Sequence, residues 1–134
     1  MANKRITSFR DLEVYQNTYT ACIKVMTEVL PKLPDSEKYD LKDQLSRSVK
    51  AIPRLIAEGY AKRHQKSGFQ KYLDDAMAEC NETIVGLEMW RDIYGKAMNG
   101  LFVEELIDLY DKSGRQLYNL AKAWSKFKHE KLNR

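Results

Sequence analysis

The chain has 134 residues, enough for one domain that buries about two thirds of the surface exposed by its unfolded form, so no disulfide or metal is needed to stabilise it. Its six glycines, three prolines and many helix-favouring residues exclude a turn-rich β-sheet fold. The formal net charge of +4 is compatible with polyanion binding and equally with ordinary solubility.

Neither export nor membrane insertion is expected. Residues 1–10 lack the apolar core of a signal peptide, and no eighteen apolar residues run together. Cys22 and Cys80 occupy apolar positions in their segments, so they are interpreted as reduced thiols in the core of a cytoplasmic protein.

A first helix is predicted over residues 9–30, where apolar side chains recur at steps of three and four. This stripe comprises Leu12, Tyr15, Tyr19, Cys22, Ile23, Met26, Val29 and Leu30. Pro31 and Pro34 then withdraw backbone donors and end the helix, and Asp35 or Ser36 is available to cap the next one.

A second helix is predicted over residues 36–64, with a kink at Pro53. A proline inside a helix removes one hydrogen bond and clashes with the carbonyl four residues back, at Val49, but the apolar stripe is unbroken on both sides. Gly59 marks either the helix end or a close approach of another backbone, and the continuing apolar register favours close packing. The stop is expected in residues 65–68, QKSG.

Two further helices are predicted over residues 67–95 and 101–129, each with an apolar stripe at helical spacing. Each stripe needs a partner, and the connections are short. The whole chain, residues 1–134, is therefore expected to form a single all-α domain, an antiparallel up-down-up-down four-helix bundle.

The sequence contains no recognisable catalytic or cofactor motif. CxxC, HExxH, Glu-x-x-His and the glycine-rich phosphate loops are all absent, and His64 and His129 lie in polar stretches typical of exposed side chains. Glu58 and Glu82 border apolar stripes and would suit acid–base work or a metal, but pairing with a cation is favoured, for example Arg54 with Glu58. No enzyme activity and no cofactor are expected.

A basic face on the second helix is the stronger feature. Arg47, Lys50 and Arg54 fall at i, i+3 and i+7 and share one side of the helix. The candidate nucleic-acid-binding residues are Arg47, Lys50, Arg54, Lys62, Arg63 and Lys66. Such a stripe can follow a phosphate backbone. However, the acidic Asp43 and Glu58 share part of this face, so a solvated surface of salt bridges with no nucleic-acid partner is an equal alternative.

Large aromatic rings are more numerous than one narrow core accommodates, which predicts self-association. The rings considered are Tyr15, Tyr19, Tyr60, Tyr72, Trp90, Tyr94, Tyr110, Tyr118 and Trp124. In a closed ring, a weak basic stripe on each subunit would be repeated and its affinity for a long polyanion multiplied.

Three stretches resemble the small four-helix-bundle proteins encoded in intervening sequences of bacterial 23S rRNA genes. They are FRDLEVY, DQLSRSVKAIPRLIAEGYAKR and SGFQKYLDDAMAECNETIVGLE. The residues that fit the family pattern are Gln44, Leu45, Arg47, Ile52, Pro53, Ile56, Ala57, Glu58, Gly59, Ser67, Phe69, Leu73 and Glu82. The chain departs from the pattern at Tyr15, Ser48, Ala51, Leu55 and Gly68, and Leu55 replaces an asparagine.

The resemblance implies a homopentameric ring of bundles with a basic surface suspected of binding RNA or DNA. A related branch accompanies the reverse transcriptases of diversity-generating retroelements. The leading hypothesis is thus a non-enzymatic, oligomeric, bacterial nucleic-acid-binding protein. The alternative is an assembly scaffold that docks another protein, such as a reverse transcriptase, and a carboxylate site at Glu58 and Glu82 ranks third.

Overall fold

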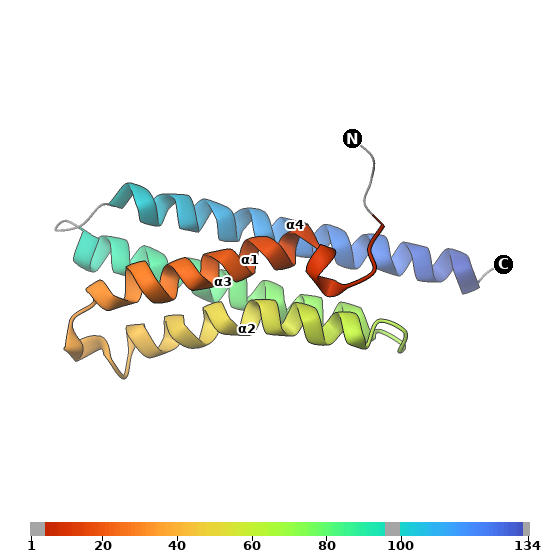
Figure 1. Ribbon diagram of the computed structural model, residues 1–134, viewed down its shortest axis with the longest axis horizontal. Coiled ribbons are helices and arrows are strands. Elements are labelled where there is room, and N and C mark those ends of the chain that lie inside the picture. The colour runs from red at the N-terminus through yellow and green to blue at the C-terminus, as the bar shows by residue number, and fades with distance from the viewer. Residues whose placement is uncertain (1–4, 96–99, 133–134) are drawn as a thin grey trace.

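The computed structural model describes residues 5–95 and 100–132, with the side chains of the last helix described at residues 100 and 102–126. Four long helices lie side by side along the molecule: α1 (Glu13–Lys24), α2 (Leu41–Ala61), α3 (Gly68–Tyr94) and α4 (Gly100–Leu132) (Figure 1). The described residues form no strand, so the predicted all-α class is confirmed. No helix in these ranges is long and apolar enough to cross a membrane.

The packing of the helices defines the corners of the bundle. α2 packs against α1 and α3, and α4 packs against α3 and α1. The connection from α1 to α2 lies at one end of the bundle, and the turn from α2 to α3 lies at the other (Figure 1). Consequently α1 and α3 occupy opposite corners, with α2 and α4 between them.

The first segment is not one continuous α-helix over residues 9–30. Ser8 and Asp11 cap a separate 3-10 turn at Phe9–Asp11, because the Ser8 hydroxyl accepts from a backbone N–H of the turn and the Asp11 carboxylate accepts the Ser8 N–H. The extended Leu12 follows, so α1 begins at Glu13. Beyond Lys24 the chain passes through a π-helical turn at Val25–Val29.

The second helix starts later than predicted. Residues Asp35–Glu37 form their own 3-10 turn, and Asp40 takes a non-helical conformation (φ −127°, ψ −107°) just before Leu41. Neither Asp35 nor Ser36 caps α2, because both lie before this break. The third and fourth helices fall within three residues of their predicted bounds over the described part of the chain.

α2 passes through Pro53 without interruption, as the unbroken apolar stripe predicted. Its fully buried side chains include Leu45, Val49, Ile52 and Ile56, which meet buried residues of the other helices in one core. Cys22 and Cys80 are free thiols and both are buried, as expected. Burial raises the pKa of Cys80 to about 12, so this thiol stays protonated at neutral pH.

Gly59 is a contact point between helices and not a helix end. It is buried inside α2, and a Cβ built on it would lie 2.6 Å from Cβ of Tyr72 on α3. Farther along the same interface, a Cβ on Gly86 of α3 would lie 2.7 Å from a methyl carbon of Leu45. The two glycines therefore allow α2 and α3 to approach closely at two levels, and the predicted close packing at Gly59 is confirmed.

A buried polar contact joins the same two helices. The hydroxyl oxygens of Ser48 and Thr83 lie 2.8 Å apart, and each is also within hydrogen-bonding distance of a carbonyl in its own helix, that of Leu45 or Glu79. The bond between the two hydroxyls forms only when Ser48 and Thr83 lie at the same level, so it favours one register of α2 on α3.

Candidate nucleic-acid interface

Three cations project from the outer face of α2. Arg47, Lys50 and Arg54 are all exposed. One guanidinium nitrogen of Arg47 lies 2.9 Å from a carboxylate oxygen of Asp43, an exposed pair one turn apart that contributes little to stability. Lys50 and Arg54 form no ion pair with the described residues, so their charges remain available to an anionic partner.

An open groove of about 590 Å³ runs beside these cations, between α2 and α3. Its lining consists of Gln44, Arg47, Ser48, Lys50, Ala51, Arg54, Glu79 and Glu82. A smaller hollow of about 390 Å³ shares Arg54 with this groove and includes Glu58 and Asp75. The basic face of α2 thus borders carboxylates of α3, which will weaken its attraction for a polyanion.

Glu79 is the carboxyl most affected by this environment. Partial burial raises its pKa, and the neighbouring Glu82 and Asp75 raise it further through charge repulsion and, for Glu82, a hydrogen bond. The ionised form of Glu79 is therefore less favourable in the folded chain than in the unfolded chain.

The remaining predicted contact residues are positioned differently. Lys62 Nζ donates to the Tyr72 hydroxyl at 2.6 Å, and this hydrogen bond raises the pKa of the ammonium group. Arg63 donates to the carbonyl of Tyr60 at 2.8 Å, and its guanidinium carbon lies 4.0 Å from the centre of the Tyr60 ring. Both cations are half-buried and contact aromatic residues near the C-terminal end of α2. Lys66, by contrast, is exposed in the turn that follows.

The two glutamates considered for acid–base or metal chemistry are not brought together with further ligands. Within the described residues, no group of three or more His, Cys, Asp or Glu side chains is arranged to hold a metal ion. The predicted ion pair between Arg54 and Glu58 is also absent from that part of the chain. Glu82 also forms no ion pair with a described residue, so the expected pairing of Glu82 with a cation was wrong as well.

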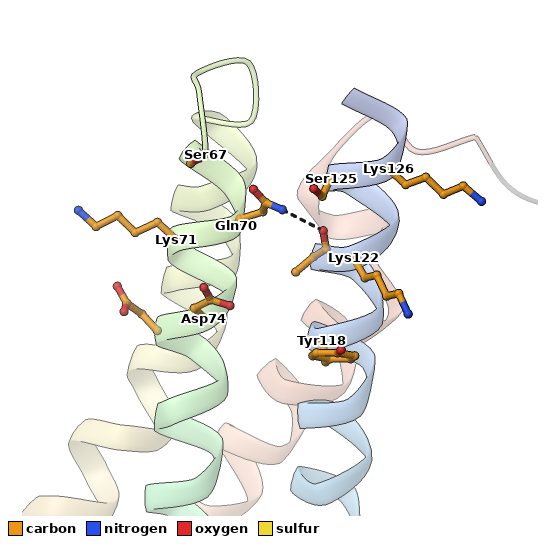
Figure 2. Close-up of a pocket in the computed structure, with 10 residues that line it drawn as sticks. Ser67, Gln70, Lys71, Asp74, Tyr118, Lys122, Ser125 and Lys126 are labelled. Carbon is orange, nitrogen blue, oxygen red and sulfur yellow. Dashed lines mark hydrogen bonds between the residues drawn. The ribbon is translucent and has the colours of Figure 1, made fainter. Parts of the chain in front are cut away.

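A second open groove, of about 970 Å³, lies between α3 and α4 and was not predicted. Figure 2 shows Tyr118, Lys122 and Lys126 on successive turns of α4, beside the helix that carries Gln70, Lys71 and Asp74. Gln70 reaches toward α4, whereas the Lys122 and Lys126 side chains extend away from that helix. The Gln70 amide donates to the carbonyl of Ala121 at 3.4 Å and bridges the two walls. The i, i+4, i+8 spacing of the α4 residues is visible in the sequence, but lysines near the C-terminal end of a helix also suit the helix dipole, so their spacing alone does not indicate a groove.

One family model, described as 23S rRNA-intervening sequence protein, matches residues 10–119. The chain belongs to this family. The match covers α1, α2, α3 and most of α4, and so includes the whole basic face of α2 and the groove beside it. No curated protein matches the chain. Membership in the 23S rRNA-intervening sequence protein family thus agrees with the resemblance seen in the central helix.

Replacing Glu79 with glutamine is expected to stabilise the protein at neutral pH by up to about 1 kcal/mol, the scale of solvent-screened charge interactions. Because the pKa of Glu79 is raised, its protonated form favours folding at low pH, and this contribution is lost as pH rises through the folded-state pKa. The gain should therefore be seen at pH 7 and vanish below about pH 4, near the usual glutamate pKa.

Urea unfolding at several pH values measures this effect. Glu105→Gln, at an exposed position of α4, is the matched control. A gain at Glu79 that persists unchanged at pH 3 would contradict the assigned cause.

Proposed function

We propose that this protein is a non-enzymatic, cytoplasmic nucleic-acid-binding bundle that acts as a homo-oligomer. The observation that carries the proposal is the exposed row of Arg47, Lys50 and Arg54 on α2, in which two of three cations lack a carboxylate partner among the described residues. Two further parts complete the proposal: the antiparallel order of the helices, expected from their lengths and short connections, and a homopentameric ring, implied by the family resemblance.

The geometry of the row fits a phosphate backbone. Arg54 lies seven positions after Arg47 on the helix, a rise of about 10 Å. One strand of a duplex places about three phosphates over that length, at 3.4 Å of axis per phosphate. Contacts of this kind read charge and not base identity, so binding would be salt-dependent and weakly specific for sequence.

Repetition in an oligomer offsets the weakness of a single site. The carboxylates of the α2–α3 groove lower the affinity of each copy. When several copies engage one long RNA or DNA, each later contact forms at high effective concentration, and the overall affinity exceeds that of one copy by orders of magnitude.

Fluorescence anisotropy of a structured RNA and of a matched duplex DNA tests the proposal. We expect binding near physiological salt that weakens steeply as salt is added. Changing Lys50 and Arg54 together to alanine should weaken binding at every sequence tested. It should also reduce the slope of log affinity against log salt by about two for each engaged copy, since each phosphate contact contributes about 0.9.

The matched control is Lys24→Ala with Lys32→Ala, which removes the same charge from exposed positions on α1 and the turn that follows it. An equal loss in the control would mean that net charge, and not the α2 face, governs binding. Binding confined to very low salt would contradict the proposal and favour the scaffold alternative, with a protein such as a reverse transcriptase as partner.

A further inference from the structure

An exposed apolar row runs along α3. Val85, Met89 and Ile93 occur at i, i+4 and i+8, and they are 48%, 48% and 62% exposed. Three large apolar side chains on successive turns of one helix face form a stripe and not the isolated apolar residues common on protein surfaces. We call this the α3 row.

A second exposed row lies on α1 and has the same spacing. Tyr15, Tyr19 and Ile23 again occur at i, i+4 and i+8, and Tyr19 and Ile23 are 51% and 47% exposed. The ring of the half-buried Tyr15 lies 5.9 Å from that of Tyr19 and 4.9 Å from that of Phe9, so aromatic packing extends the row toward the N-terminal turn. We call this the α1 row.

The two rows match each other in length and lie at opposite corners of the bundle. Each spans nine residues, a rise of about 12 Å along the helix. The helices α1 and α3 are separated by α2 and α4, so the rows cannot cover each other within one chain. One copy can nevertheless offer its α1 row to the α3 row of another.

The charges around the two rows are complementary. α3 contains six carboxylates and two cations, a net charge of −4. Next to α1, α2 contains four cations and two carboxylates, a net charge of +2. Lys50 lies at this side: burial raises the pKa of Cys22 on α1, and the nearby Lys50 ammonium opposes that shift. An acidic border would thus meet a basic one.

We infer that copies of this chain associate head to tail, with the α1 row of one copy packed on the α3 row of the next. The inference deepens the oligomeric part of the proposed function and does not depend on nucleic-acid binding. An interface between two different surfaces is heterologous, and it either closes into a ring or continues as a filament. In a ring every row is covered, and α2 and α4 lie on the two remaining surfaces.

Light scattering with sedimentation velocity, in the absence of nucleic acid, tests the arrangement with two single variants. Ile23→Glu places a charge in the α1 row and leaves the α3 row intact. Met89→Glu places a charge in the α3 row and leaves the α1 row intact. Because every contact needs one row of each kind, each variant alone should be a folded monomer of 15.7 kDa. Mixed, they retain one intact row each, so they should form a 1:1 dimer of about twice that mass and nothing larger.

The control is Tyr118→Glu, which introduces the same charge at an exposed position of α4 and should keep the wild-type mass. Circular dichroism establishes that each variant is folded. A monomeric wild type at tens of micromolar would overturn the inference. So would one variant that stays fully assembled while the other dissociates, because that result means like rows pair with each other. Failure of nucleic-acid binding would leave these masses unchanged.

Discussion

Gly59→Ala is expected to destabilise the protein, although alanine is the better helix former. The added Cβ would lie 2.6 Å from Cβ of Tyr72, a backbone-anchored atom that cannot rotate away. Overpacking of this kind costs about 1–3 kcal/mol. The higher helix propensity of alanine offsets about 1 kcal/mol of it. We expect a lower urea midpoint with an unchanged slope.

The matched control is Gly114→Ala in α4, where a Cβ meets nothing within 4 Å. Only the propensity gain applies there, so this variant should be stabilised by up to about 1 kcal/mol. The two alanine substitutions should therefore move stability in opposite directions. Equal stabilisation at both positions would mean that α2 and α3 do not approach closely at Gly59.

Trp90→Ala is expected to cost about 3–5 kcal/mol, the range for deleting a large aromatic side chain from a core. Trp90 is only 2% exposed and is among the largest fully buried side chains of the described residues. The loss combines buried apolar area with the cavity left behind. Equilibrium urea unfolding followed by circular dichroism would measure it without relying on tryptophan fluorescence.

Trp90→Phe separates the volume of this side chain from its polar group. The indole nitrogen Nε1 has no hydrogen-bond partner in the described part of the chain, so phenylalanine loses no bond and should cost much less than alanine. A Phe variant as unstable as the Ala variant would indicate that the indole N–H makes an essential hydrogen bond.

The helical architecture was predictable because periodic apolar residues specify helices wherever a core exists. The helix starts were less predictable. At Ser8 and Asp11 a local pair of capping bonds closes a turn that the apolar spacing does not reveal. The role of Gly59 was predictable in kind, since register continued beyond it, but its partner Tyr72 depends on how α2 and α3 pack.

The candidate interface was predictable only where it lies on one helix. The spacing of Arg47, Lys50 and Arg54 specifies a shared face without tertiary information. The engagement of Lys62 with Tyr72 depends on side chains that packing brings together. The α3 row was not predictable because Val85, Met89 and Ile93 are residue types typical of a core. Only their exposure in the folded chain distinguishes them from core residues.

Chemical modification of the two buried thiols can measure conformational fluctuations of the folded chain. Cys22 lies on α1 and Cys80 on α3, at opposite corners of the bundle, and no disulfide joins them. A thiol reagent attacks only an accessible thiolate, and burial suppresses ionisation of both groups. Their separate alkylation rates would therefore distinguish detachment of the short helix α1 from opening of the whole bundle, without any introduced label.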